Sequence, residues 1–113
     1  TEKINYSKYK KNNGESIYLR IRVPGSTLNT GCKGVTLLLK SGERINWSDE
    51  PVDTDYDSYN NSWTYTSFTI LDNEMIEKLI DDPITDVKLY IYKSSIGNPD
   101  IYSTYLNCVL EMN

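Results

Sequence analysis

The stretch SIYLRIRV, residues 16–23, decides the fold class of this chain. Apolar and polar side chains alternate along it without a break, which is the period of a strand with one buried face. The apolar face carries Ile17, Leu19, Ile21 and Val23, and the opposite face carries Tyr18, Arg20 and Arg22. The stretch therefore predicts a half-buried strand, which Pro24-Gly25 ends.

Similar segments on both sides of this strand predict two hairpins. Residues 3–10 alternate more weakly and lead into it through Asn13-Gly14, the strongest short hairpin signal. Residues 33–40 form another strand, and the tight turn at Ser41-Gly42 leads into residues 43–47. The inward side chains of that strand are expected to be Val35, Leu37 and Leu39.

Two later segments, residues 63–71 and 84–93, are rich in β-branched and aromatic residues and predict two more strands. In the first, we expect the inward side chains to be Thr64, Thr66, Phe68 and Ile70. In the second, we expect them to be Val87, Leu89 and Ile91, with Tyr90 and Tyr92 outward.

The period changes in LDNEMIEKLIDDP, residues 71–83, where the apolar residues follow one helical stripe. We expect a short helix over residues 72–82, with Asp72 as its N-cap and Pro83 as its stop. Asp82 lies at the helix end that disfavours negative charge. Residues 101–111 fit both a strand and a helix, and their β-branched and tyrosine content favours a strand.

Together these elements predict a mainly β fold. Residues 1–113 form a single domain, built as a small antiparallel β-sandwich of about seven strands with one short helix, immunoglobulin-like in general shape. A chain of 113 residues can bury a real core, and 38% apolar content is that of a folded globule. Tyrosine is unusually frequent, with ten residues against one Phe.

Several functional classes are excluded by composition. The absence of histidine removes the histidine-dependent nucleophile systems, and two cysteines cannot form a four-ligand zinc site. The net charge is −4, and the only basic cluster lies near one chain end, so we expect no nucleic acid as partner. No apolar run approaches the roughly 18 residues that a transmembrane segment needs. Carboxylate-pair chemistry stays open, but nothing singles out two of the sixteen acids, so we expect no enzyme.

The acidic residues Asp53, Asp55 and Asp57 alternate between the two tryptophans of the chain. Closely spaced aspartates can supply several of the six to eight oxygens that calcium takes, so a weak calcium site is one interpretation. In the other, these aspartates belong to a solvated loop, or point outward from an edge strand and prevent pairing with other edges.

Aromatic side chains carry the second candidate site. If the side chains alternate along each strand as expected, one outward face holds Trp63, Tyr65, Tyr90, Tyr92 and Tyr18. Such a face could stack sugar rings or anchor a protein partner. Alternatively, the helix and the long connection cover this face, and the tyrosines pack in a second layer with their hydroxyl groups hydrogen-bonded.

Cys32 and Cys108 allow a single disulfide, and two free, buried thiols are the alternative. The chain begins with Thr and carries no signal peptide, as a mature exported protein would.

Four segments, YLRIRVPGS, GVTLLLKSGERINW, FTILDNEMIEKLIDDPITDVKLYIY and YLNCVL, resemble in that order small exported or lipid-anchored sandwich domains of Bacteroidetes that have no assigned function. The resemblance covers residues 16 to 110 and rests on structural motifs, so no catalytic residue is carried over. It implies an extracytoplasmic location, in the periplasm, on the outer membrane surface or secreted, with a lipid anchor upstream of Thr1 as one way to reach it.

The sequence thus leads us to expect a non-catalytic binding module of the cell envelope that contacts a glycan or a protein through an exposed aromatic face. One alternative is a calcium-stabilised structural module that uses residues 53–57. The other is a carboxylate-dependent glycan hydrolase.

Overall fold

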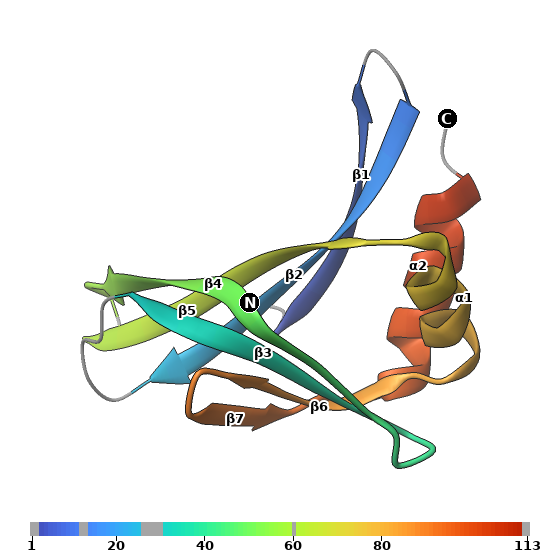
Figure 1. Ribbon diagram of the computed structural model, residues 1–113. Coiled ribbons are helices and arrows are strands. Elements are labelled where there is room, and N and C mark those ends of the chain that lie inside the picture. Colours follow the sequence, from blue (N-terminus) through green and yellow to red (C-terminus); the bar gives the residue numbers. More distant parts are fainter. Residues whose placement is uncertain (1–2, 12–13, 26–30, 60, 112–113) are drawn as a thin grey trace.

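The structure, a computed structural model, describes residues 3–11, 14–25, 31–59 and 61–111. Within these ranges, seven antiparallel strands form one curled sheet in the order β1-β2-β5-β4-β3-β6-β7, and two helices lie together at one end of it (Figure 1). The elements are β1 (Ile4–Lys11), β2 (Gly14–Gly25), β3 (Cys32–Leu39), β4 (Arg44–Asp57), β5 (Ser62–Leu71), α1 (Asn73–Asp81), β6 (Ile84–Leu89), β7 (Tyr92–Ser95) and α2 (Pro99–Glu111). The mainly β, antiparallel class is therefore confirmed.

The sequence predicts a two-sheet sandwich, but the strands form one curled sheet, a half-barrel. Strand β4 is the reason for this difference. Its first part pairs with β3 as far as Val52 opposite Cys32, and its last part pairs with β5 from Asp53 onward. Because one strand belongs to both ladders, the two halves of the sheet stay continuous. A bulge in β3 at Gly34, which has φ +113°, adds local twist beside this junction.

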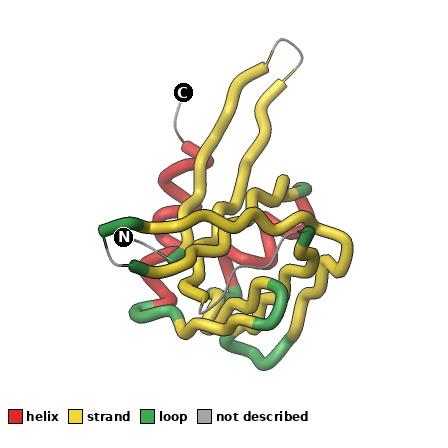
Figure 2. Tube along the Cα trace, turned by 90° about the vertical axis from the view of Figure 1, so that its left-hand side faces the viewer, coloured by secondary structure: helices red, strands yellow, loops and turns green. Residues whose placement is uncertain are grey.

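The core lies on the concave side of the sheet. The alternation of the sequence correctly predicts its main members, which are Ile17, Leu19, Ile21, Val23, Val35, Leu37, Leu39, Val87 and Leu89. Strand β2 also contacts β6 and β7 across this side, so the curl brings distant parts of the sheet together. The β1–β2 hairpin, which Asn13-Gly14 predicts, projects beyond the rest of the sheet (Figure 2).

Two tyrosines fill the middle of the concave side. Tyr65 is fully buried, and its ring centroid lies 4.7 Å from that of Tyr92. Strand β2 passes so close to this pair that a Cβ atom at Gly25 would lie 2.1 Å from Cε2 of Tyr65. Only a residue without a side chain leaves this space to the ring.

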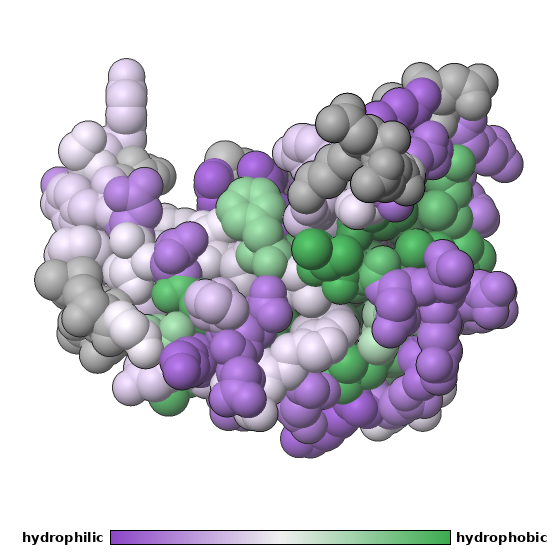
Figure 3. All heavy atoms as spheres, turned by 45° about the horizontal axis from the view of Figure 1, so that its top comes forward, coloured by the Kyte–Doolittle hydropathy of each residue, from purple (hydrophilic) through white to green (hydrophobic). Residues whose placement is uncertain are grey.

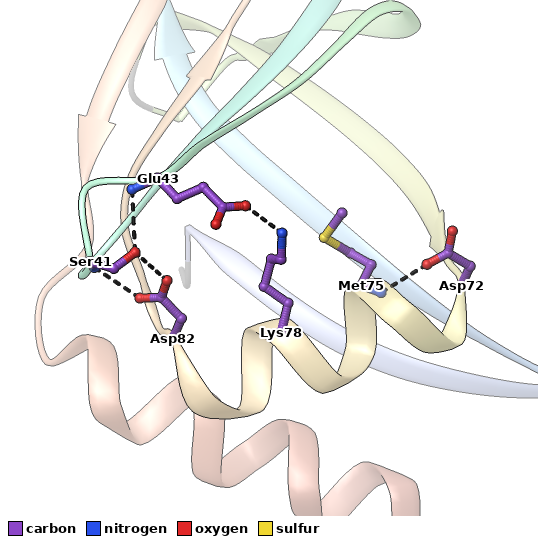
Figure 4. Close-up of polar contacts among 6 residues, drawn as sticks. All are labelled: Ser41, Glu43, Asp72, Met75, Lys78 and Asp82. Atoms are coloured by element: carbon purple, nitrogen blue, oxygen red, sulfur yellow. Dashed lines mark hydrogen bonds and ion pairs between the residues drawn. The ribbon is translucent and has the colours of Figure 1, made fainter.

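Helix α1 confirms the helix expected over residues 72–82. The Asp72 side chain accepts a hydrogen bond from the backbone N–H of Met75 at 2.8 Å, and Ile76 and Leu79 are buried. At the other end, the Asp82 carboxylate accepts hydrogen bonds from the backbone N–H and the hydroxyl of Ser41 (Figure 4). The acid that looks unfavourable in the sequence therefore ties the end of α1 to the β3–β4 turn.

A second link between α1 and the same turn lies beside Asp82. Lys78 forms an ion pair with Glu43 (Figure 4). The hydrogen bond to Glu43 raises the pKa of Lys78, while partial desolvation opposes that rise.

The strand expected over residues 101–111 is wrong, because these residues form helix α2. Leu106 is fully buried, and the partly buried apolar residues around it recur at helical spacing. Polar contacts also hold the helix in place: the Ser103 hydroxyl donates to the carbonyl of Leu79 at 2.7 Å, Lys8 Nζ donates to the carbonyl of Leu110 at 3.2 Å, and Lys40 pairs with Asp100 at 3.3 Å. Packing against α1 and β1 thus outweighs the intrinsic preference of this segment.

The single strand expected over residues 84–93 is also wrong, because it is divided into β6 and β7. Tyr90, with φ +58°, and Ile91 form the turn of a hairpin between them. Ile91 is consequently 59% exposed instead of inward.

Candidate binding surfaces

The aromatic face predicted from the sequence does not assemble. Tyr65 is buried in the core, Trp63 and Tyr92 pack partly buried against it, and Tyr90 lies in the β6–β7 turn. Of the five residues proposed, Tyr18 lies on the convex face of β2, as expected.

The side chains of β5 face the opposite side of the sheet from the one that the sequence predicts. This reversal explains most of the difference between the predicted aromatic face and the structure. Pairing with β2 places Thr69 opposite Leu19 and Ser67 opposite Ile21, on the concave side, and places Phe68 on the convex side. The concave side of a tightly curled sheet offers little room, so small side chains suit positions opposite large aliphatic ones. The apolar character of Phe68 and Ile70 therefore misled the sequence-based prediction.

A different set of side chains gathers on the convex face of β1, β2 and β5. Phe68 is 52% exposed, Ile70 61% and Tyr9 52%. Ile70 pairs across the strands with Tyr18, whose ring meets that of Tyr9 edge to face with centroids 4.9 Å apart. We call Tyr9, Tyr18, Arg20, Phe68 and Ile70 the aromatic patch. On the face shown in Figure 3, most of the hydrophobic surface lies on one side of the view, with smaller apolar spots elsewhere and hydrophilic side chains around them.

Two arginines border the exposed apolar side chains. Arg20 lies opposite Phe68, and Arg22 lies opposite Thr66 on the same face. The Nε atom of each arginine is buried and has no hydrogen-bond partner in the part of the chain that the structure describes. Thr66 in turn lies opposite Asp53. The convex face thus changes along its length from apolar through cationic to acidic.

The acidic stretch is part of strand β4 and not a loop. Val52 is buried while Asp53 and Asp55 are exposed, opposite Thr66 and Thr64 of β5. The aspartates therefore point outward as one interpretation predicts, but from a strand inside the sheet instead of an edge. Across the described ranges, no group of three or more Asp, Glu or Cys residues could hold a metal ion. The side chain of Asp57 lies outside the described part.

The second candidate surface is a groove of about 540 Å³ on the convex face of β4, β3, β6 and β7. Strand pairing arranges its floor in two rows, which are Asn46–Thr36–Lys88–Lys93 and Arg44–Leu38–Asp86–Ser95. Three of these side chains are cationic and one is acidic. We call this surface the basic groove.

The two cysteines form no disulfide. Cys32 is buried at the start of β3, whereas Cys108 is exposed on α2, and both thiols are free. The alternative of two free thiols describes the structure, except that only one of them is buried.

Comparison with known proteins identifies no relative. The chain matches no protein-family model, no curated protein and no solved structure. Within the described residues, neither helix is long and apolar enough to span a bilayer.

Sequence reasoning missed most of both surfaces. The signal for the basic groove is that Thr36, Arg44 and Lys88 each lie next to buried apolar residues of their own strand and so point to its opposite face. Strand order brings these positions together, and the sequence does not reveal that order. For the aromatic patch, the available signal was the pair Ser67 and Thr69, whose small size suits the concave side of a curl.

Proposed function

We propose that this protein is a non-catalytic binding module that holds a protein partner through the aromatic patch. The observation that carries the proposal is the exposure of Tyr9 on β1 and of Phe68 and Ile70 on β5, with Tyr18 of the intervening strand β2 between them. Contiguous exposed apolar surface of this kind marks interaction sites. Aromatic residues and arginine are also the residues that carry most binding energy at protein interfaces.

A protein fits the patch better than a sugar does. Phe68 and Ile70 have no polar atom that could meet a sugar hydroxyl, and Ile70 has no ring on which a sugar could stack. Their aliphatic and aromatic surface is instead suited to apolar side chains, which lose water when they pack against it.

The arginines define the charge of the partner. Arg20 and Arg22 present guanidinium groups next to the apolar side chains, and a carboxylate can bind such a group through two parallel hydrogen bonds. The expected partner segment therefore combines apolar side chains with neighbouring Asp or Glu residues. We further propose an extracytoplasmic location at the cell envelope, which the resemblance of the sequence supports.

Selection from a displayed library of random peptides tests this proposal. We expect enriched peptides to combine aromatic or aliphatic residues with acidic ones. Their affinity is expected to fall at least about tenfold, or 1.4 kcal/mol, in Phe68→Ser. Ile91→Thr removes an equally exposed apolar side chain outside the patch, and it is expected to leave affinity unchanged.

Three outcomes would contradict the proposal. The first is no enrichment, and the second is enrichment of peptides that bind Phe68→Ser as well as they bind the unaltered protein. The third is a concentration-dependent dimer in sedimentation that Phe68→Ser abolishes, because a second copy of the chain would then occupy the patch. Unchanged circular dichroism spectra of both variants establish that they fold.

A further inference from the structure

The basic groove differs from the rest of this acidic protein in its charge. Arg44, Lys88 and Lys93 lie along it with a single carboxylate, Asp86, among them. Asp86 already accepts hydrogen bonds from the hydroxyl of Ser95 at 2.8 Å and from that of Thr85 at 3.0 Å. The carboxylate is thus held by hydroxyl groups.

The three cations have no carboxylate of their own in the part of the chain that the structure describes. Ion pairs there involve other lysines, namely Lys8, Lys10, Lys40 and Lys78. Within the same ranges, Arg44, Lys88 and Lys93 form neither an ion pair nor a side-chain hydrogen bond. Their charges are therefore available to a ligand in the groove.

The arrangement of two of these cations also points to an anion. Lys88 and Lys93 lie directly opposite each other on β6 and β7, and both side chains are on the convex face. Like charges at opposite positions of an antiparallel pair destabilise it. A negatively charged group bound between them would turn this repulsion into attraction.

The uncharged residues that line the groove indicate the chemical class of the ligand. Thr36 donates a hydrogen bond to Oδ1 of Asn46 at 2.8 Å, which leaves the amide N–H groups of Asn46 to donate to a hydroxyl. Leu38 adds an apolar surface between these polar residues. A volume of about 540 Å³ lies in the range of ligand sites. No aromatic side chain lines the groove in the described ranges, so it lacks the stacking surface that single-stranded nucleic acids use.

From these observations we propose that the basic groove binds an acidic oligosaccharide, whose sugar units carry carboxylate or sulfate groups. The anionic groups lie between Lys88, Lys93 and Arg44, and the sugar hydroxyls face Thr36 and Asn46. This site is separate from the aromatic patch, since it lies on the other half of the sheet.

Isothermal titration calorimetry with four probes tests the inference. The probes are an oligogalacturonate, a sulfated oligosaccharide of similar length, a neutral cello-oligosaccharide and a single-stranded oligonucleotide of matched charge. We expect at least one acidic sugar to bind, with an affinity that falls as salt concentration rises. The tighter binder of the two identifies the anionic group. We expect the neutral sugar not to bind and the oligonucleotide to bind at least tenfold more weakly.

The matched variants are Lys88→Gln with Lys93→Gln in the groove, and Lys33→Gln on the exposed surface of β3 outside it. The double variant is expected to lose at least tenfold in affinity while its melting temperature stays the same or rises, because a repulsion is removed. Lys33→Gln and Phe68→Ser are expected to bind like the unaltered protein.

Several results would overturn the inference. These are binding of neither acidic sugar, equal binding of the neutral sugar or of the oligonucleotide, and equal losses in the groove variant and in Lys33→Gln. Because Phe68→Ser probes the other surface, failure of the proposed function would leave this test unaffected.

Discussion

The contact between Gly25 and the ring of Tyr65 gives a sharp test of the core. In Gly25→Ala, the new methyl group would lie 2.1 Å from Cε2 and 2.5 Å from Cδ2 of Tyr65, and 3.2 Å from Cε2 of Tyr92. The Tyr65 ring is fully buried and stacked on Tyr92, so it cannot swing into solvent to make room. The substitution must displace strand β2 or the ring.

Overpacking of this kind costs about 1 to 3 kcal/mol. The backbone at Gly25 does not have a positive φ, so alanine adds no conformational strain and recovers about 0.4 to 1 kcal/mol by restricting the unfolded chain. Gly97→Ala is the matched control, because a Cβ atom there meets nothing within 4 Å and the residue also lacks a positive φ. We therefore expect Gly25→Ala to be about 2 kcal/mol less stable than Gly97→Ala.

Urea unfolding followed by circular dichroism measures this difference. With a denaturant slope of about 2 kcal/mol per molar urea, the midpoint of Gly25→Ala is expected about 1 M below that of Gly97→Ala. The smaller side chain in Tyr65→Leu is expected to reduce the effect of Gly25→Ala when the two are combined. Equal midpoints for the two alanine variants would refute the reasoning, because the ring would then not lie against Gly25.

Three further predictions concern buried groups and thiols. Thr69→Val is expected to raise the free energy of unfolding by about 1 kcal/mol, because Thr69 Oγ1 is buried without a hydrogen-bond partner in the described structure; a lower urea midpoint would contradict this. Burial raises the pKa of Tyr6 in the folded protein, whereas the same tyrosine in the unfolded chain titrates at about pH 10. The contribution of Tyr6 to the free energy of unfolding is therefore fully present below about pH 10, and above that pH it falls by about 1.4 kcal/mol per pH unit. Tyr6→Phe is expected to lessen this alkaline loss in urea midpoints measured from pH 9 to 11, and an unchanged slope would count against it. In unreduced native protein a thiol reagent is expected to modify Cys108 alone, and Cys32 only after unfolding; no reaction at either residue would indicate a disulfide.

The parts of the fold that the sequence predicts correctly are those in which local pattern and tertiary environment agree. The alternation in residues 16–23 and 33–40 requires one buried face, and both strands bury that face. The helical stripe after Asp72, with its N-cap and its Pro83 stop, has no competing strand interpretation. These segments carry enough information in their own residues to specify their structure.

The wrong predictions share a different cause, which is that neighbours in space decide between two allowed local states. Residues 101–111 fit either a strand or a helix, and packing against α1 and β1 selects the helix. The parity of β5 follows from its pairing with β2 inside a curl, where Ser67 and Thr69 fit and Phe68 does not. Both binding surfaces depend on strand order, so single-strand patterns could not predict them.

The curl of the sheet also determines how the protein opens. The strand order ends at β1 and β7, and in the described part of the chain a side chain reaches between them, as Lys3 Nζ donates to the carbonyl of Ser95 at 2.9 Å. Among the described residues this contact comes from a side chain and not from a strand ladder, whereas β2 and β5 lie within continuous ladders on both sides. In native-state hydrogen exchange, the amides of β1 and β7 are therefore expected to exchange first through local opening. The amides of β2 and β5 are expected to exchange only through global unfolding. Local opening is therefore expected to begin at the two ends of the strand order and not at the centre of the sheet.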